Sequence, residues 1–368
     1  MDKKTLLFIC TASNTVINFR KELILFLIKL GYKIHLICGD NEREEEIRSL
    51  GISTLHILNF SNRSINPFQF LKTKKEIRKI SNEINPYCIL TFQAKPNIAT
   101  AFALKNIHFP IISFVEGLGI IANKTSIRNR FFGFVTSRMY KKAFKRINKV
   151  FVLNEDDKNY LLNNKFLSES KLYLINGIGI DCDKYQKIER FTNEKNVIML
   201  SRLALDKGVL NYCEIAKLVR QSRKDINFFL YGEQGNLRLK KIQPYIDSGD
   251  LIYKGFTKDV KSLFKNFRIL ALPSNIREGL PRTLMEASAS GLPCIIYDIV
   301  GSKEVVMHNK TGLVIENNNT KQYADSIIKL IDNTELLNTF GTNASLLCKE
   351  KFDSNVINAI IAKQINFN

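Results

Sequence analysis

Short apolar runs alternate with stretches of helical periodicity along the chain, and this alternation constrains the fold most strongly. Between the first two strand candidates, residues 18–30 have the period of an amphipathic helix that ends at Gly31, and Pro96 opens another helix. Strands that alternate with helices predict a parallel sheet covered by helices on both faces. The strand candidates of the first half are residues 5–12, 33–39, 87–93, 111–117 and 149–155.

The same alternation restarts in the second half of the chain. Residues 176–190 are rich in glycine and charge and lack an apolar period, so we interpret them as a linker. A chain of 368 residues exceeds one ordinary hydrophobic core. We therefore predict two successive α/β domains, with ligands near the carboxyl ends of the strands and in the cleft between the domains. The later strand candidates are residues 196–202, 226–232, 251–256, 268–274 and 293–298.

The basic composition predicts an anionic partner. Fifty-five Lys and Arg residues against 35 Asp and Glu give a formal net charge of +20. Nucleic acid, acidic phospholipid and phosphorylated substrates all remain open, as does a compositional bias toward Lys, Asn and Ile. No apolar run reaches the roughly 18–20 residues that cross a bilayer, and the N-terminus lacks a secretory signal. We expect a cytoplasmic protein.

The cysteines and histidines predict neither disulfides nor a metal site. The seven cysteines are odd in number and form no C-x-x-C pair, and no histidine lies at ligand spacing from another His or Cys. Cys10, Cys38, Cys88 and Cys294 lie in apolar surroundings and are predicted to be buried thiols. We expect no bound metal and no resident cofactor.

One segment of the second half, "REGLPRTLMEASASGLPC" at 277–294, combines two carboxylates with a helix start. Pro281 opens a helix predicted over 282–290, so Glu278 precedes that helix and Glu286 lies within it. The free N–H groups of the first turn favour an anion, and the carboxylates suit hydroxyl groups. A sugar nucleotide offers both kinds of group. The alternative is a capped helix with two solvated acids.

Two further turns follow strands of the same half. Arg202 is the last residue of the strand candidate 196–202 and Lys207 lies in the turn after it, where two cations could neutralise a diphosphate. The strand candidate 226–232 runs into Gly232, and Gly235 follows it; both glycines would allow a ligand to approach the backbone closely. Ordinary loop charges and a plain turn are the alternatives for these residues.

These segments occur in the order of a known family. "SRLALDKG", "LYGEQG", "LPSNIREGLPRTLMEASASGLPCI" and "GSKEVV…KTGLVI" resemble retaining glycosyltransferases of family 4, and Glu278 and Glu286 match the E-x7-E signature of that family. The resemblance implies the GT-B fold, an α/β architecture in which two Rossmann-like domains face each other across a cleft. It implies an acceptor-binding domain over 1–187, a nucleotide-sugar-binding domain over 188–345, and a C-terminal helix over 346–368 that returns to the first domain.

The resemblance also implies roles for donor-binding residues. Arg202 and Lys207 would hold the donor diphosphate, and Glu286 would bind the ribose hydroxyls. Glu278, with the backbone of Gly279 and Leu280, would face the donor hexose. Family members need no bound metal, and a UDP-linked sugar is the expected donor. The remaining implied donor contacts are Gly232, Arg282 and Thr283.

The first half resembles the branch of the family that acts on polyprenyl-diphosphate-linked sugars in surface-polysaccharide and glycan assembly. The matching segments are "NTVINFRKELILFLIKLGYKI", "KPN", "VEGLG" and "VFVLNEDD", while "TASNTVINF" replaces a glycine-rich loop. Glu116 stands near a position where many relatives carry a histidine, so it could act as a base, position an acceptor hydroxyl or cap its loop. The implied acceptor-binding residues are Asn18, Arg20, Lys95, Gly117 and Gly119.

The expected reaction is transfer of a hexose or N-acetylhexosamine from a nucleotide sugar to a lipid-diphosphate-linked glycan, with retention. No unambiguous nucleophile emerges from the sequence. We therefore expect attack from the leaving-group side, in which the departing diphosphate takes the acceptor proton. The cations and the helix start would stabilise the charge that develops on the diphosphate.

Residues 126–149 contain eight basic and no acidic side chains, interleaved with aromatic residues. On a helix this pattern is typical of an interfacial membrane contact, here with the cytoplasmic leaflet of the cell membrane. The alternative is a helix packed on the first sheet by its aromatic side chains, with solvated bases. The residues predicted to touch the membrane are Arg130, Phe131, Phe132, Arg138, Lys141, Lys142 and Lys145.

Rival motifs are weak. The "DCD" at 181–183 imitates a metal-binding D-x-D but lies in the expected linker. The Gly-x-Gly pairs at 117–119 and 177–179 lack the third glycine of a dinucleotide-binding site. No recognition motif accompanies the charge, so we expect no nucleic-acid partner. The alternatives are a UDP-sugar epimerase of the GT-B fold and a non-catalytic basic protein that binds membrane or nucleic acid.

Overall fold

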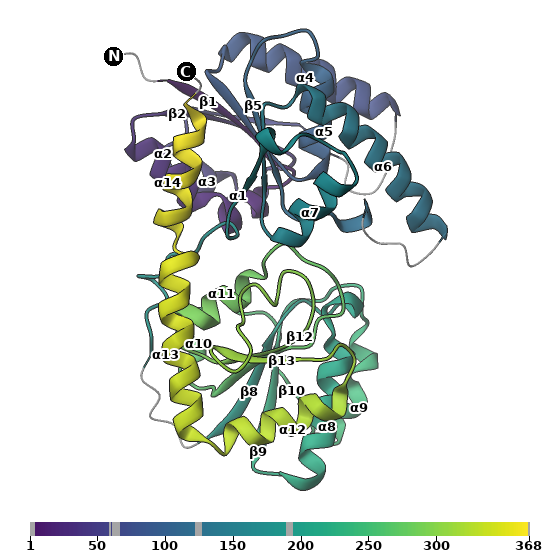
Figure 1. Cartoon of the computed structure of the whole chain (residues 1–368), viewed down its shortest axis with the longest axis vertical. Helices are drawn as coiled ribbons and strands as arrows, with labels where there is room; N and C mark the ends of the chain where they lie inside the picture. The colour runs from purple at the N-terminus through teal and green to yellow at the C-terminus, as the bar shows by residue number, and fades with distance from the viewer. Residues whose placement is uncertain (1–3, 59, 61–66, 122–126, 189–193, 367–368) are drawn as a thin grey trace. The chain divides into compact units, whose positions relative to one another are not determined.

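The computed structural model describes residues 4–58, 60, 67–121, 127–188 and 194–366 (Figure 1). The chain forms two compact units. Unit 1 comprises residues 1–179 and 354–368, and unit 2 comprises residues 180–353. The prediction of two α/β parallel-sheet domains is confirmed.

Unit 1 is built on a seven-stranded parallel sheet with the strand order β3-β2-β1-β4-β5-β6-β7. Its central strands are apolar and buried on both faces, as parallel strands covered by helices require. The order reverses direction between β1 and β4, which is the topological switch point of the sheet. The strands are β1 Thr5–Ile9, β2 Lys33–Cys38, β3 Thr54–Ile57, β4 Cys88–Phe92, β5 Ile111–Val115, β6 Lys149–Val152 and β7 Leu172–Leu174.

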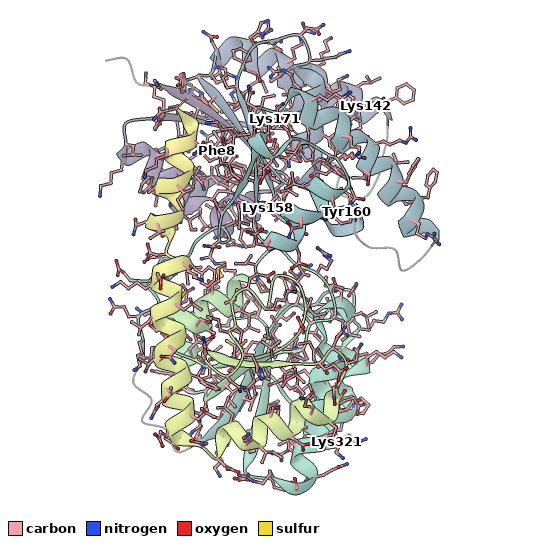
Figure 2. All side chains as sticks on the ribbon, viewed as in Figure 1. Phe8, Lys142, Lys158, Tyr160, Lys171 and Lys321 are labelled. Carbon is pink, nitrogen blue, oxygen red and sulfur yellow. The ribbon has the colours of Figure 1, made fainter. Side chains whose placement is uncertain are left out.

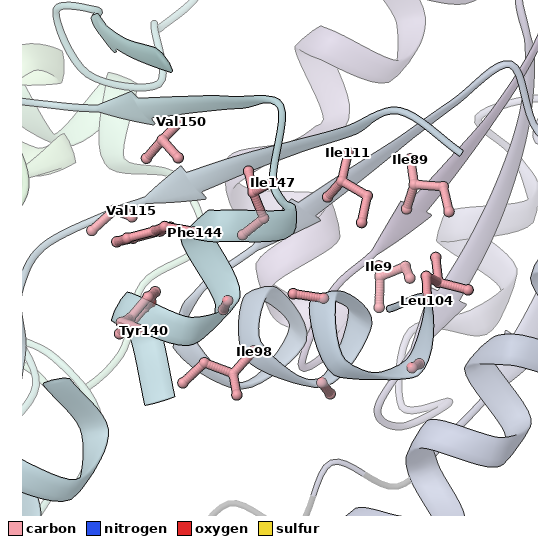
Figure 3. Close-up of a cluster of buried hydrophobic side chains, with 14 of the residues drawn as sticks. Ile9, Ile89, Ile98, Leu104, Ile111, Val115, Tyr140, Phe144, Ile147 and Val150 are labelled. Carbon is pink, nitrogen blue, oxygen red and sulfur yellow. The ribbon is translucent and has the colours of Figure 1, made fainter. Parts of the chain in front are cut away.

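Helices cover both faces of this sheet. On one face, Ile98 of α5 and Tyr140 and Phe144 of α6 belong to one buried apolar cluster with strand residues such as Val150 (Figure 3). Ile147, which follows α6, belongs to the same cluster. On the other face, α14 lies beside α2 (Figure 1). The helices of unit 1 are α1 Ser13–Phe19, α2 Lys21–Lys29, α3 Glu44–Arg48, α4 Pro67–Ile84, α5 Ala94–Ala103, α6 Ile127–Arg146, α7 Glu155–Asn163 and α14 Ser354–Ile365.

Unit 2 is built on a six-stranded parallel sheet with the strand order β10-β9-β8-β11-β12-β13, so its switch point lies between β8 and β11. The strands are β8 Lys195–Leu200, β9 Ile226–Tyr231, β10 Ile252–Tyr253, β11 Ile269–Leu272, β12 Cys294–Tyr297 and β13 Gly312–Ile315. The helices are α8 Val209–Ser222, α9 Gln243–Asp247, α10 Val260–Phe264, α11 Arg282–Ala289, α12 Thr320–Ile331 and α13 Thr334–Lys351.

The predicted strands are confirmed, and β3, β7 and β13 are additional. The single helix expected over 18–30 is wrong in its extent, because the chain forms α1 and α2 and the helix breaks at Arg20, whose φ is −124° and ψ −10°.

The four thiols predicted to be buried are buried, and burial raises the pKa of Cys38 to about 11. Among the described residues, none of the helices combines the length and apolar character that a membrane crossing requires.

The segment interpreted as a linker is more ordered than a linker. Its described part, 176–188, carries no helix or strand, yet Ile180, Cys182 and Tyr185 are buried in unit 2. Asp181 of the "DCD" motif accepts the Lys184 N–H at 2.9 Å, so this motif fixes a turn. Glycine and charge in the sequence therefore mark a packed turn at this point.

Two turns of unit 2 meet at its switch point. Gly208 has φ +75°, and a Cβ built on it would lie 1.7 Å from the carbonyl oxygen of Pro273, the residue that follows β11. The turn after β8 therefore approaches the turn after β11 as closely as backbone atoms allow. Gly249 has φ +73° but nothing within 4 Å of its built Cβ.

We predict that Gly208→Ala destabilises unit 2 far more than Gly249→Ala. Both changes force a side chain into the left-handed region, at about 1–2 kcal/mol. Only Gly208→Ala also adds a backbone clash, which should raise its cost to about 3–5 kcal/mol. Urea unfolding measures both, and equal shifts in the transition midpoint would contradict the close approach of the two turns.

Candidate active site

Polar side chains of unit 2 gather at the carboxyl edge of its sheet, in the turns that follow β8 and β11. Lys207 ends a short 3₁₀ turn, Leu205–Lys207, after β8, and Glu278 lies in the loop between β11 and α11. The two strands are neighbours at the switch point. In open parallel sheets this is the place where ligands bind.

Lys207 and Glu278 form an ion pair. The Nζ of Lys207 lies 2.6 Å from Oε2 of Glu278, and the two side chains are 24% and 16% exposed. Ser274 Oγ donates to the other carboxylate oxygen of Glu278 at 3.3 Å. The pair is thus partly shielded from water, where charged hydrogen bonds are stronger than at a free surface.

A second cluster lies on α11. Arg282 Nε donates to Glu286 Oε1 at 2.7 Å, and the hydroxyl of Tyr185 donates to the same oxygen at 3.0 Å. Glu286 is 8% exposed and Tyr185 is 5% exposed. Burial, reinforced by the charge of Glu286, raises the pKa of Tyr185, so the phenol stays protonated and donates.

The other predicted donor residues surround these clusters. Arg202 is exposed in the turn after β8, and Leu280 and Thr283 are half-buried beside the start of α11. Gly232 follows β9, and a Cβ on it would lie 1.8 Å from the carbonyl oxygen of Ser201. The carbonyl oxygen of Gly279 would lie 2.5 Å from a Cβ on Gly301, so the Glu278–Gly279 backbone is packed against the turn after β12.

In unit 1, Arg20 and Glu116 are paired. The guanidinium of Arg20 contacts the carboxylate of Glu116, and the two side chains are 3% and 20% exposed. The guanidinium also lies 4.3 Å from the ring centroid of Phe92. Burial lowers the pKa of Arg20 to about 10, so its side chain stays charged at neutral pH. A direct contact of Arg20 with an acceptor would require this pair to open.

Three of the other four predicted acceptor residues lie at the same edge of unit 1. Asn18 is exposed on α1 and accepts from Arg43 Nη1 at 3.0 Å. Lys95 is partly exposed in the first turn of α5, and burial lowers its pKa. Gly117 and Gly119 have φ of 140° and 45° in the turn after β5. Lys95, Gly117 and Gly119 therefore follow neighbouring strands, while Asn18 lies farther along α1.

Sequence reasoning missed a polar pair at the switch point of unit 1. Thr11 follows β1 and Gln93 follows β4, and their side chains are hydrogen-bonded. Gln93 has φ 72° and ψ 165°, a strained conformation for a residue other than glycine. Tyr185 was missed because the segment around it lacks a periodic signal. Ser274 was missed because a serine after a strand is common.

The two halves of α6, the helix predicted to contact the membrane, differ in burial. Its C-terminal half is packed, since Tyr140 and Phe144 are 3% and 2% exposed in the core. Its N-terminal half leaves Phe131 63% exposed, and Phe132 is half-buried. Lys142 extends from α6 (Figure 2), and the other predicted basic contacts on this helix are exposed as well, namely Arg130, Arg138, Lys141 and Lys145.

Among the described residues, the polar side chains at this edge of unit 2 offer hydroxyl, carboxylate and cationic groups to a ligand. Within these residues no group of three or more His, Cys, Asp or Glu side chains could hold a metal ion. Lys207, Arg202 and the N–H groups that open α11 suit a phosphorylated ligand. Glu278 and Glu286 suit hydroxyl groups, so the edge of unit 2 fits a sugar nucleotide chemically.

Solved structures share the fold of the whole chain. A glycosyltransferase from Rickettsia africae has a TM-score of 0.81 and 22% identity, over 99% of this chain and 98% of that chain. Anabaena HepE in complex with UDP has a TM-score of 0.79 and 18% identity, over 98% and 99%. The architecture is therefore the GT-B fold, with two parallel-sheet α/β domains.

Two family models and a curated relative match the chain in sequence. Residues 182–346 match the model for glycosyl transferases group 1, and residues 5–154 match a glycosyl transferase 4-like model. The N,N'-diacetylbacillosaminyl-diphospho-undecaprenol alpha-1,3-N-acetylgalactosaminyltransferase of Campylobacter jejuni is 27% identical over 364 residues, or 95% of each chain. The first part of the chain is thus similar to glycosyl transferase 4-like sequences, and the second part is similar to group 1 glycosyltransferases.

We predict that Arg20→Met lowers the free energy of unfolding by about 2–4 kcal/mol, because it leaves the Glu116 carboxylate largely buried without its cation. The double variant Arg20→Met with Glu116→Gln should recover part of that loss. Arg48→Met removes an exposed pair with Glu44 in the same unit and should cost under about 1 kcal/mol. Chemical denaturation measures all three variants. No recovery in the double variant would contradict the pairing.

Proposed function

We propose that this chain is a retaining glycosyltransferase of family 4. It transfers a hexose or N-acetylhexosamine from a UDP-linked sugar to a polyprenyl-diphosphate-linked glycan in bacterial polysaccharide biosynthesis. The observation that carries the proposal is the Lys207–Glu278 pair at the switch point of unit 2, close in sequence to the helix that carries Glu286. It combines a cation for the diphosphate with carboxylates for the sugar and the ribose.

The donor is bound by unit 2 in this proposal. The diphosphate takes the place of Glu278 as the partner of Lys207, and the exposed Arg202 and the first turn of α11 add donors. Glu278 is then released toward a sugar hydroxyl, and the half-buried Gly279–Leu280 backbone lines the same side. Glu286 binds the ribose. The UDP bound by Anabaena HepE, which shares the fold, supports uridine as the base.

The acceptor is bound by unit 1. The Campylobacter relative is named for a diphospho-undecaprenol acceptor and matches this chain along nearly its full length, which supports a lipid-diphosphate glycan as the acceptor class. Glu116 is the candidate for contact with the acceptor hydroxyl, since its side chain is 20% exposed while Arg20 beneath it is 3% exposed. Lys95, Gly117 and Gly119 lie in turns at the same edge of the sheet.

The proposed chemistry is attack on the donor sugar from the leaving-group side. The bond between the anomeric carbon and the diphosphate oxygen breaks, the acceptor oxygen bonds to that carbon, and the diphosphate takes the acceptor proton. Lys207 and Arg202 stabilise the negative charge on the departing diphosphate without a resident metal. Glu116 orients the acceptor hydroxyl.

Contact with the membrane brings the enzyme to a lipid-linked substrate. The exposed basic residues of α6 and the exposed Phe131 would meet the anionic inner face of the cell membrane, while Tyr140 and Phe144 keep the helix packed on the sheet. The protein would then be cytoplasmic and peripherally associated.

We predict that UDP stabilises the wild-type protein by roughly 2.7 kcal/mol at about 100 times its dissociation constant, and that GDP and ADP stabilise it less. Lys207→Ala should weaken UDP binding by about 1.5–3 kcal/mol because it removes a charged contact. Lys217→Ala, on the exposed face of α8, is the matched control and should bind UDP normally. Thermal shift and calorimetry measure these effects. A wild-type protein that responds to no nucleotide would favour a non-catalytic basic protein.

Transfer is separated from epimerisation by its dependence on an acceptor. Incubation with a panel of nucleotide sugars and short prenyl-diphosphate saccharides, read by mass, should show one saccharide extended by one sugar. Release of free UDP should require the acceptor. A changed nucleotide sugar without acceptor would identify an epimerase, and an inverted anomeric configuration in the product would refute retention.

We predict that replacing Arg138, Lys141 and Lys142 by Gln weakens binding to vesicles with anionic lipid by up to about 3 kcal/mol, at about 1 kcal/mol per charge. UDP affinity should not change. Replacing Lys321, Lys329 and Lys349 by Gln removes the same charge from exposed positions of unit 2 and should leave vesicle binding intact. Sedimentation with vesicles measures binding. Equal losses in the two triple variants would mean that net charge, and not α6, drives the association.

A further inference from the structure

Tyr185 is a buried side chain in the turn by which the chain enters unit 2, and it has no role in the reaction proposed above. Its hydroxyl donates to Oε1 of Glu286 at 3.0 Å, although 101 positions separate the two residues. A buried phenol needs a hydrogen-bond partner, and here the partner is a proposed ligand-binding carboxylate.

The contacts of Glu286 are asymmetric. Arg282 Nε and the Tyr185 hydroxyl both donate to Oε1. In the part of the chain that the structure describes, the contacts of this carboxylate all fall on Oε1, so Oε2 is the oxygen left for a ligand. Two donors on one oxygen also fix the rotation of the carboxylate group.

The turn that carries Tyr185 is held at several points. Asp181 accepts the Lys184 N–H at 2.9 Å, and the backbone N–H of Tyr185 donates to the carbonyl of Asp181 at 3.2 Å. Ile180 donates its N–H to the carbonyl of Phe352 at 2.9 Å. The phenol is therefore placed by a fixed backbone, so it can orient Glu286 at little entropic cost.

We propose that Tyr185 is a positioning residue for donor binding: with Arg282 it holds Oε1 of Glu286, so that Oε2 faces the ribose hydroxyls of a nucleoside diphosphate. The inference rests on the proposed function, since it takes Glu286 as the ribose-binding group. It adds a residue from the entry turn of unit 2 to the donor site.

The test is a comparison of UDP with 2′-deoxy-UDP by calorimetry. A positioned carboxylate should make wild type prefer UDP, and Y185F should reduce that preference by about tenfold, the factor that corresponds to 1.4 kcal/mol. Binding of 2′-deoxy-UDP should be nearly the same in both proteins. A merely structural Tyr185 predicts equal weakening of both ligands, or no change in either, and each of these results would overturn the proposal.

Two further variants sharpen the comparison. Tyr245 donates its hydroxyl to Glu214 in the same unit, so Y245F removes the same kind of bond outside the site and should keep the preference for UDP. E286Q should lose the preference while Tyr185 is intact, and Y185F added to E286Q should change it no further. An additional loss in that double variant would show that Tyr185 does not act through Glu286.

Stability and wild-type binding separate this inference from the proposed function. The melting temperature of Y185F is measured first, to show that the variant is folded. The E286Q variant tests the same carboxylate while Tyr185 stays in place. If wild type binds UDP and prefers it to 2′-deoxy-UDP, but Y185F keeps that preference, the inference fails and the proposed function stands. If wild type binds both ligands equally, the ribose assignment and this inference fail together. If it binds no nucleoside diphosphate, the proposed donor fails.

Discussion

Parallel pairing places the carboxyl end of every strand on the same edge of its sheet, and the arrangement of polar groups in this protein depends on that constraint. The central strands of each unit are largely apolar and buried, so the charged groups that meet at this edge come mainly from the turns and helices that follow the strands. Lys207 and Glu278 meet because β8 and β11 are neighbours at the switch point of unit 2. Arg20 and Glu116 meet by the same logic, since both lie at the carboxyl edge of unit 1.

Much of the fold could be predicted because the central strands are continuous apolar runs between turn residues. β3 is a short edge strand with no buried residue, and β7 has only one buried position, so neither has the signal of a central strand. The break between α1 and α2 was not predictable from periodicity. Arg20 continues the helical pattern in the sequence, but its guanidinium is buried and contacts Phe92 and Glu116.

The candidate site divides along similar lines. The sequence was enough to propose Glu278, Glu286 and Lys207, because each lies near a strand or helix boundary that the sequence also predicts. Their pairing could not be, since Lys207 and Glu278 are 71 positions apart and the contact is made by tertiary packing. The role of Tyr185 was harder still to predict from the sequence. A turn rich in glycine and charge reads as a linker until the core that receives its apolar side chains is known.

The positive charge of the chain is not all available to an anionic partner, because part of it satisfies backbone carbonyl groups. Arg146, in the last turn of α6, donates to carbonyls that include those of Leu104 and Phe109, and burial lowers its pKa. Lys171 donates to three carbonyls around the C-terminus of the same helix, where a cation is also favoured by the helix dipole. These cations anchor α6 on the sheet. Within the described part of α6, the basic side chains that remain exposed, from Arg130 to Lys145, are therefore free of this anchoring role and can meet a phosphate-bearing surface.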